Sequence, residues 1–385
     1  MLTLLGVLSL VIWLYLLFFH GRFWRLAPIL APAPAPGGPG VRVAAVIPAR
    51  DEAAVVGQSV TALLSQEGGH SLHIFLVDDS SSDDTARVAR QAAKTAGQPE
   101  CFTVIQGRAL EPGWSGKLWA VEQGLEQARQ FDPEFILLTD ADIAHAPESV
   151  ATLVAIARRG GYDLVSCMVK LHCGTFAERA LIPAFVFFFL QLFPPAWIAN
   201  PRRKMAGAAG GSILIRPEAL ALAGGIEAIR GEVIDDCALA RRVKQTGGRI
   251  WLGLTATTCS VRPYGTFSEI GKMISRGAFS QLRHSAAMLL LALVGLTVTY
   301  VVPPVLTIFS HRWLPSLVGA AAWISMAVCF LPTVRFYRLN PLWVLALPLI
   351  SIFYMGASLH SAFKFWSGRG GEWKGRVQDP SGSRT

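Results

Sequence analysis

Four long runs without a charged side chain constrain this chain more than any other feature of its sequence. The first, Leu2–Phe19, opens the chain, and the others lie near its end, at Ala286–Phe309, Trp313–Pro332 and Leu342–Phe363. A helix of about 20 apolar residues is long enough to cross a lipid bilayer. The sequence therefore predicts a membrane protein with apolar helices at both ends.

Nearly all of the acidic residues lie between these runs, from about Val41 to Ser285. Only 16% of the 385 residues are charged, against about 25% in a typical soluble domain. Yet 26 Asp and Glu and 36 Gly are too many for spanning helices alone. We expect an N-terminal transmembrane helix over 1–21, a polar domain over 41–285, and a C-terminal membrane region of two or three helices over 286–365.

The remaining parts are a Pro/Ala/Gly linker over 22–40 and a basic flexible tail over 366–385. Arg22 and Arg25 follow the first apolar run, so the positive-inside rule puts the polar domain in the cytoplasm. A cleaved signal peptide is a weaker alternative, because no Lys or Arg precedes the run. The number of crossings stays open: three C-terminal spans would place the basic tail outside, and segments can turn back at Pro303-Pro304 or Pro348.

A further apolar and Phe-rich stretch, Leu181–Ile198, lies inside the polar domain. A core helix is one interpretation. We favour a membrane-interface segment over 178–204, because aromatic residues beside the basic residues 202–204 suit the depth of lipid headgroups.

With six Cys and no C-x-x-C pair, the chain shows no disulfide framework. The chain has a net charge of +9, and its basic residues cluster beside the apolar runs, which favours anionic lipid over nucleic acid as a partner.

The polar domain begins with alternating strand and helix patterns. Short apolar runs predict strands at Val43–Ile47, Leu72–Val77, Phe102–Ile105 and Phe135–Leu138, and helical patterns cover Val55–Gln66, a segment from near Ser82, and Lys117–Gln130. Ser81-x-x-Asp84 resembles a capping box for the second helix. This order predicts an α/β fold with an open, mostly parallel sheet and helices on both faces.

Acidic residues follow three of these strands. Asp51 and Glu52 follow the first, Asp78-Asp79 the second, and Asp140-Ala141-Asp142 the last. Because ligands of doubly wound sheets bind beyond the carboxyl ends of the strands, we expect these acids at one rim. So many carboxylates together favour a bound cation or sugar hydroxyls. The Asp140 and Asp142 pair suits Mn²⁺ or Mg²⁺, which prefer oxygen ligands and bridge to phosphates.

Two later features add candidate functional groups. Asp235-Asp236 opens a helical pattern, where Asp235 can serve as an N-cap and a carboxylate can act as a general base. Gly113-Trp114-Ser115-Gly116-Lys117 precedes a helix without matching a Walker loop, and Lys117 is a candidate nucleotide contact rather than an ordinary exposed lysine.

Five motifs occur in a fixed order in the polar domain: I-P-A-R-D-E (47–52), V-D-D (77–79), G-W-S-G-K (113–117), D-A-D (140–142) and D-D-x-x-L (235–239). Together they resemble family 2 glycosyltransferases of the GT-A fold, over about residues 41–285. Pro183-Ala184-Phe185, Ala208-Ala209-Gly210-Gly211 and Ile234-Asp235-Asp236-Cys237 look most like the hopanoid-biosynthesis-associated membrane glycosyltransferases, which are distantly similar to ceramide glucosyltransferases.

The resemblance implies a role for each matching residue. Asp51 and Asp79 would hold the uridine and ribose of a UDP-sugar, with Glu52, Asp78 and Lys117 on the same donor side. Asp140 and Asp142 would carry the metal and diphosphate. Asp236 would be the base, implying inversion at the anomeric carbon, and the acceptor side would comprise Gly210, Gly211, Ser212 and Asp235.

The sequence departs from the family pattern in its missing Q/R-x-x-R-W motif. Its nearest stretch is Ser275–Phe279, so Arg276 or Arg283 is the expected phosphate contact, and a processive polymer synthase is disfavoured. We expect a metal-dependent, inverting, UDP-sugar-dependent transferase of the bacterial inner membrane, with a lipid hydroxyl as acceptor. Open alternatives are a polyprenyl-phosphate acceptor, a nucleotidyltransferase, and a non-catalytic lipid-binding protein with a dead transferase domain.

Overall fold

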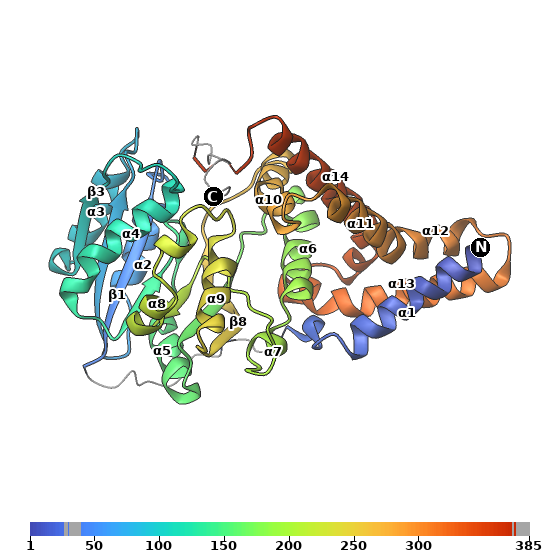
Figure 1. Cartoon of the computed structure of the whole chain (residues 1–385), viewed down its shortest axis with the longest axis horizontal. Coiled ribbons are helices and arrows are strands. Elements are labelled where there is room, and N and C mark those ends of the chain that lie inside the picture. The colour runs from blue at the N-terminus through green and yellow to red at the C-terminus, as the bar shows by residue number, and fades with distance from the viewer. Residues whose placement is uncertain (27–29, 31–39, 372, 375–385) are drawn as a thin grey trace. The chain divides into compact units, whose positions relative to one another are not determined.

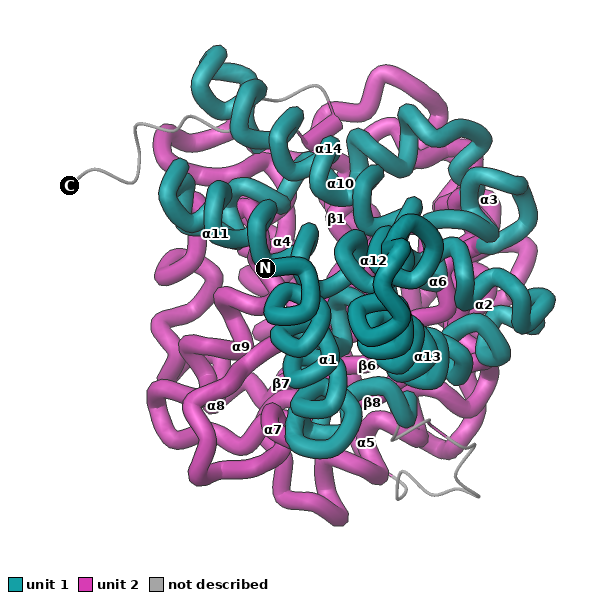
Figure 2. The backbone as a smooth tube through the Cα atoms, turned by 90° about the vertical axis from the view of Figure 1, so that its right-hand side faces the viewer, with its two compact units in different colours: residues 1–27, 173–196, 263–371 teal, residues 28–172, 197–262, 372–385 magenta. Residues whose placement is uncertain are grey.

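The structure is a computed structural model, which describes residues 1–26, 30, 40–371 and 373–374. The chain divides into two compact units, coloured separately in Figure 2. Unit 1 comprises residues 1–27, 173–196 and 263–371, and unit 2 comprises residues 28–172, 197–262 and 372–385. Most of the predicted linker and much of the predicted tail lie outside the described residues.

Unit 2 contains the whole β-sheet. Its strands are β1 (Arg42–Ala49), β2 (Ser71–Asp78), β3 (Phe102–Gln106), β4 (Phe135–Leu138), β5 (Ile143–Ala144), β6 (Leu164–Lys170), β7 (Ile213–Ile215) and β8 (Ile250–Ser260). Its helices are α2 (Val56–Leu64), α3 (Thr85–Thr95), α4 (Gly116–Ala128), α5 (Ser149–Gly160), α8 (Pro217–Leu222) and α9 (Asp235–Gln245), and the short α7 (Pro195–Ile198) begins in unit 1 and ends in unit 2.

The sheet has the strand order β3-β2-β1-β4-β7-β6-β8-β5. The first four strands are parallel, β7 runs antiparallel to both β4 and β6, β8 is parallel to β6, and β5 is antiparallel to β8. The predicted α/β sheet is therefore confirmed, as a mixed sheet. The four predicted strands are β1 to β4, while β5 to β8 were not predicted.

Strands β1 and β4 and the second half of β2 are buried on both faces, which explains why they read as continuous apolar runs. In β1, Val43 and Ile47 belong to the main hydrophobic core together with Val60 of α2. Full burial of one such side chain contributes about 1.5–3 kcal/mol. On α4, which Figure 1 shows beside β1, a Cβ at Gly124 would lie 2.5 Å from Val46, so glycine lets this helix approach the sheet closely.

The predicted capping box at Ser81-x-x-Asp84 is wrong. Helix α3 begins at Thr85, and its N-cap residue Asp84 makes no side-chain cap hydrogen bond. Instead, Asp83 Oδ2 accepts a hydrogen bond from the Ala53 N–H at 3.0 Å, and Ser81 Oγ accepts one from the Asp51 N–H at 3.0 Å. These polar side chains therefore join the loop after β2 to the loop after β1, instead of closing the helix end.

Unit 1 is helical. It consists of α1 (Leu2–Phe18), α6 (Phe176–Leu192), α10 (Phe267–Gln281), α11 (Ala286–Leu296), α12 (Val302–Phe309), α13 (Trp313–Phe336) and α14 (Leu347–Trp366). Within the described ranges, four helices are long and apolar enough to cross a membrane: Phe176–Ile198, Ala286–Phe309, Trp313–Phe336 and Pro341–Trp366. Helix α1 is apolar but shorter. The segment around α6 thus joins the C-terminal runs as a candidate span.

Helix α6 lies in the core of unit 1. It contacts α10, α13 and α14, and Leu181, Phe187 and Leu190 are buried. The Phe187 ring packs edge-on against Phe330 of α13 at a centroid distance of 5.2 Å. The phenylalanines at 185–189 are buried or half-buried within this unit, and the membrane-interface segment over 178–204 stays a prediction.

The run Ala286–Phe309 is one continuous helix that contains a π-helical turn, Thr297–Val301. The indole N–H of Trp13 donates a hydrogen bond to the Thr299 carbonyl in this turn at 2.7 Å. The bond satisfies the Thr299 carbonyl, which would cost free energy if it stayed without a hydrogen bond in an apolar environment. Pro303-Pro304 follow this π-helical turn inside the continuous helix, so they do not turn the segment back. Pro348 stands in the first turn of α14, where proline is tolerated.

Candidate active site

The acids predicted at the strand ends lie at the carboxyl ends of the neighbouring parallel strands β2, β1 and β4. Asp51 has a positive φ of 52°, and its Oδ1 accepts hydrogen bonds from the backbone N–H of Ser82 at 2.7 Å and from the Ser82 hydroxyl at 3.0 Å. The Ser82 N–H holds the pKa of Asp51 below its ordinary value. The loops after β1 and β2 therefore form one joined surface.

Asp78 and Asp79 lie at the end of β2 and are both buried. Asp78 Oδ1 accepts a hydrogen bond from the Ser81 N–H at 3.0 Å, which stabilises the turn after the strand. Asp79 Oδ2 lies 3.7 Å from the guanidinium of Arg50, which also donates to the Asp79 carbonyl at 2.5 Å. Asp78 thus serves the turn, while Asp79 is paired with a cation.

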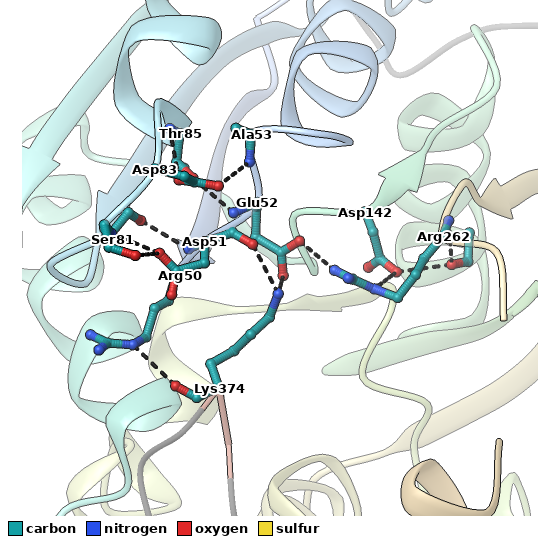
Figure 3. Close-up of polar contacts among 12 residues, drawn as sticks. Arg50, Asp51, Glu52, Ala53, Ser81, Asp83, Thr85, Asp142, Arg262 and Lys374 are labelled. Carbon is teal, nitrogen blue, oxygen red and sulfur yellow. Dashed lines mark hydrogen bonds and ion pairs between the residues drawn. The ribbon is translucent and has the colours of Figure 1, made fainter. Parts of the chain in front are cut away.

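A chain of alternating charges runs along this rim (Figure 3). Asp142 Oδ2 lies 3.2 Å from Arg262 Nε and accepts a hydrogen bond from the Ser260 hydroxyl at 2.9 Å. Another nitrogen of Arg262 is ion-paired with Glu52 Oε2, and Glu52 Oε1 lies 2.8 Å from the ammonium of Lys374. The side chains of Glu52 and Asp142 are only 9% and 14% exposed, so these cations neutralise carboxylates largely removed from water.

A second group of charges is centred on Lys117. Its ammonium lies 2.9 Å from Asp140 Oδ1 and 3.0 Å from Asp235 Oδ2. Helix α4 begins one residue earlier, capped by Ser115, whose hydroxyl oxygen accepts a hydrogen bond from the Leu118 N–H. The predicted helix start is thus confirmed. The Lys117 side chain points to two acids of the predicted site, one from the D-A-D segment and one from α9.

Lys117, Asp140, Asp235 and Asp236 line one pocket together with Gly210. Asp236 accepts two backbone hydrogen bonds, from the Gly210 N–H at 2.8 Å and from the Cys237 N–H at 2.7 Å. A Cβ at position 210 would lie 3.3 Å from Asp236 Oδ2, so the close approach of backbone and carboxylate favours glycine. The pocket joins a residue predicted on the acceptor side to acids predicted on the donor side.

Burial, together with the neighbouring Asp235 carboxylate, raises the pKa of Asp236 to about 6 against the attraction of Lys117. Removal from water likewise raises the pKa of Asp140, again against the attraction of Lys117. A carboxyl group with a pKa near 6 is ionised at neutral pH and is a stronger base than an ordinary aspartate. The predicted N-cap role of Asp235 is wrong, because Ile234 precedes the helix and Asp235 is its first residue.

Gly211 and Ser212 lie just before β7, which pairs with β4 in the sheet. The Thr139 hydroxyl, just before Asp140, donates a hydrogen bond to the Gly211 carbonyl at 2.8 Å. Ser212 is 2% exposed. Hence the Gly-Gly-Ser segment is fixed to the D-A-D segment, with the Ser212 side chain inside the fold.

The chain is similar to known proteins in sequence and in fold. Residues 39–279 match the family model described as glycosyltransferase like family 2. The chain belongs to glycosyltransferase family 2. This membership makes the protein a glycosyltransferase enzyme and confirms the family-level resemblance predicted from its motifs.

Two curated relatives of this family 2 glycosyltransferase are undecaprenyl-phosphate 4-deoxy-4-formamido-L-arabinose transferases. Those of Pseudomonas savastanoi pv. phaseolicola (strain 1448A / Race 6) and Pseudomonas syringae pv. syringae (strain B728a) are 36% and 34% identical to it over 96 residues, 25% of this chain. The chain therefore matches about a quarter of each relative's length, 26% in both cases. The narrower resemblance to hopanoid-associated and ceramide-type enzymes remains a prediction.

In fold, the glycosyltransferase is similar to the mannosyltransferase PcManGT from Pyrobaculum calidifontis, solved in complex with GDP-Man and Mn²⁺. The TM-score is 0.56 at 16% sequence identity, covering 94% of this chain and 99% of that chain. At this identity the likeness shows the fold alone, which is the predicted GT-A type.

The family 2 site offers oxygen ligands suited to a divalent cation, although no group of three or more His, Cys, Asp or Glu converges among the described residues. Asp140 uses Oδ1 for Lys117, and Asp142 uses Oδ2 for Ser260 and Arg262. One further oxygen on each carboxylate can bind Mn²⁺ or Mg²⁺, which commonly take one or two carboxylates plus substrate phosphates. The oxygen atoms of Asp140 and Asp142 therefore fit a Mn²⁺ or Mg²⁺ ion when a substrate phosphate completes its coordination.

Sequence reasoning missed two cations of the rim. Arg276 or Arg283 is the expected phosphate contact; they lie in and just after α10 of unit 1, and this role stays a prediction. Arg262, directly after β8, is the arginine that pairs with Glu52 and Asp142. A basic residue at the end of the run 250–260 was the available signal, but that run was not recognised as a strand. Lys374 gave no such signal, because it follows the last helix.

Proposed function

We propose that this family 2 glycosyltransferase is anchored in the bacterial inner membrane and transfers a sugar from a UDP-sugar to a lipid hydroxyl, with inversion. The acceptor would be a hopanoid or another isoprenoid lipid. The single observation that carries the proposal is the placement of Asp236. It is half-buried, held by two backbone N–H groups, raised in pKa, and shares its pocket with Asp140 and Lys117.

On the donor side, Asp51, Glu52, Asp78 and Asp79 would surround the nucleoside, because they follow the carboxyl ends of β1 and β2, where such sheets bind nucleotides. Lys117 would meet the diphosphate, since its ammonium lies at the edge of the D-A-D segment. Asp140 and Asp142 would hold a divalent cation, which would neutralise the diphosphate as it leaves.

In the transfer step, Asp236 would accept the proton of the acceptor hydroxyl. The acceptor oxygen forms a bond to the anomeric carbon as the bond from that carbon to the diphosphate oxygen breaks, and UDP leaves with the electron pair. Attack from the face opposite the leaving group inverts the configuration. The acceptor side would be shaped by Gly210, Gly211, Ser212 and Asp235. Asp235 is the neighbour of Asp236 in the chain, and Gly210 contacts Asp236 in the fold.

The apolar helices support a lipid acceptor. Four helices of the described residues have the length and composition to cross a bilayer, and many large apolar side chains of unit 1 are exposed, among them Leu291, Phe309 and Leu349. Exposed apolar surface on this scale is costly in water and favourable in lipid. We therefore place unit 1 in the membrane and the predicted catalytic domain on its cytoplasmic side.

The test uses the purified protein in detergent with a panel of UDP-sugars, Mn²⁺ and total membrane lipid, followed by mass spectrometry of new products and determination of the anomeric configuration. A UDP-sugar-dependent neutral glycolipid with inverted configuration supports the proposal. A retained configuration, or transfer only from other nucleotide sugars, contradicts it.

A polyprenyl-phosphate acceptor is the second candidate, favoured by the printed names of the curated relatives. The two candidates differ in their need for a base. A lipid hydroxyl must lose a proton, whereas a phosphate monoester is largely ionised at neutral pH. Loss of the Asp236 carboxylate should thus lower transfer to a hydroxyl about 10²–10⁴-fold but leave most of the transfer to undecaprenyl phosphate.

A further inference from the structure

Lys374 is bound to the loop after β1 by three polar contacts (Figure 3). Its ammonium lies 2.8 Å from Glu52 Oε1 and donates a hydrogen bond to the Asp51 carbonyl at 3.1 Å. Its own carbonyl accepts a hydrogen bond from Arg50 Nε at 3.3 Å. Both the backbone and the side chain of Lys374 are thus fixed at the end of β1, where Glu52 and Arg262 link the lysine to Asp142 on the proposed diphosphate side.

Lys374 balances one negative charge here, because Glu52 and Asp142 carry two negative charges against the single positive charge of Arg262. Glu52 Oε2 is already paired with Arg262, which also serves Asp142. Holding the segment in place does not require the ammonium, because Arg50 binds the Lys374 backbone. A further ligand at the rim is therefore met by the N–H donor of the ammonium that these contacts leave open, not by an unpaired charge.

The geometry of the ammonium leaves room for that ligand. A lysine ammonium has three N–H donors, and in the described part of the chain two of them face Glu52 and Asp51. The side chain is 25% exposed, so the remaining donor is within reach of solvent and ligands. A phosphate oxygen is the acceptor that best matches a compact, strongly hydrated charge on a flexible stem.

We propose that Lys374 is a donor-binding residue whose ammonium group contacts the diphosphate of the nucleotide sugar. This inference rests on the proposed function, because it needs a nucleoside diphosphate donor at the rim formed by β1, β2 and β4. Lys374 lies beyond residue 279, where the family match ends. The C-terminal segment of the chain thus supplies part of a site otherwise built from the family domain.

The test compares the affinities of the detergent-purified full chain for UDP and for uridine, measured by calorimetry with Mn²⁺ present. Lys374→Met should weaken UDP binding about five- to tenfold and leave uridine binding unchanged, because uridine has no phosphate. Lys374→Arg should restore most of the UDP affinity. Lys94→Met, which removes an exposed lysine on α3, is the matched control and should bind both ligands as the wild type does.

Three results would overturn the inference. Unchanged UDP binding by Lys374→Met means that the lysine only holds the segment. An equal loss of UDP and uridine affinity points to a distorted loop, and tighter UDP binding means that Lys374 blocks the site. Failure of the wild type to bind UDP is distinguishable from all three, since it refutes the proposed UDP donor and the inference with it.

Discussion

Replacing Asp236 with Asn is the sharpest test of the proposed mechanism, because it lowers activity strongly while it changes stability at neutral pH only slightly. The side chain keeps its size and loses its charge. Proton removal by a positioned base contributes about 10²–10⁴-fold to a rate, so transfer to a hydroxyl acceptor should fall by that factor. UDP binding should stay close to that of the wild type, because Asp236 lies on the acceptor side of the proposed site.

The effect on stability follows from the raised pKa. The carboxyl group changes its pKa from 3.8 in the unfolded chain to about 6 in the folded one. At neutral pH both states are ionised, and the charge costs the folded state about 3 kcal/mol, at 1.36 kcal/mol per unit of pKa. Asparagine removes this cost, but its amide cannot accept both backbone N–H groups, and one unsatisfied donor costs about 1–3 kcal/mol. The net change at neutral pH is therefore small.

The pH dependence separates the two effects. Because the folded pKa lies above the unfolded one, the wild type regains stability as the pH falls through about 6 towards 4. Linkage gives about 1.4 kcal/mol between about pH 7.5 and pH 5. The stability of Asp236→Asn relative to the wild type should therefore fall by that amount over the same range, and wild-type activity should be lost as the pH falls through about 6.

The measurements are denaturant unfolding in detergent at several pH values and product formation at neutral pH. Asp132→Asn is the matched control, because Asp132 is exposed and precedes β4 at the end of the strand opposite the acids. Wild-type activity in Asp236→Asn with the lipid hydroxyl, or a pH dependence of stability equal to that of the wild type, would refute the assignment of Asp236.

Three further substitutions test the surroundings of the site. Asp142→Ala removes one proposed metal ligand and should raise the Mn²⁺ concentration needed for half-maximal activity about tenfold; an unchanged Mn²⁺ titration speaks against this site. Arg262→Met leaves two largely buried carboxylates with fewer partners and should destabilise the protein by about 2 kcal/mol in denaturant unfolding; unchanged stability would show that the pairing is weak. Gly210→Ala places a methyl group 3.3 Å from Asp236 Oδ2 and 3.6 Å from Lys117 Nζ and should lower the transfer rate at least about tenfold with little change in stability. Gly356→Ala, which has nothing within 4 Å of the added Cβ, is its control, and equal activity of the two variants would contradict the prediction.

Much of the acidic rim could be predicted from the sequence, because parallel strands end at one edge and the residues after them must meet there. Asp51, Asp79 and Asp140 were placed in this way. The prediction depended only on apolar runs with polar ends, a local pattern that reports burial on both faces of a sheet. The same pattern also identified β1 to β4 to within one or two residues.

The other half of the sheet could not be predicted on these grounds. Strands β5 and β7 have two and three residues, too few for a periodic pattern. Strand β8 ends in a Thr-rich stretch, and its parallel partner β6 is some eighty residues earlier, so the pairing depends on long-range contacts. Because β8 went unrecognised, Arg262 could not be placed. Lys374 could not be placed either, because only the folded chain brings it to Glu52.

The division of the chain into interleaved stretches limits how this enzyme can be dissected. Residues 173–196 of unit 1 lie in the sequence between strands β6 and β7 of unit 2. A truncated protein that begins after α1 and stops before α10 would keep the whole sheet, yet it would also keep α6 and lose α10, α13 and α14, which cover it. The apolar face of α6 would then be bare, and such a fragment should aggregate in water. Studies of the catalytic half alone must therefore replace α6 with a short polar connection, or retain the helices of both ends.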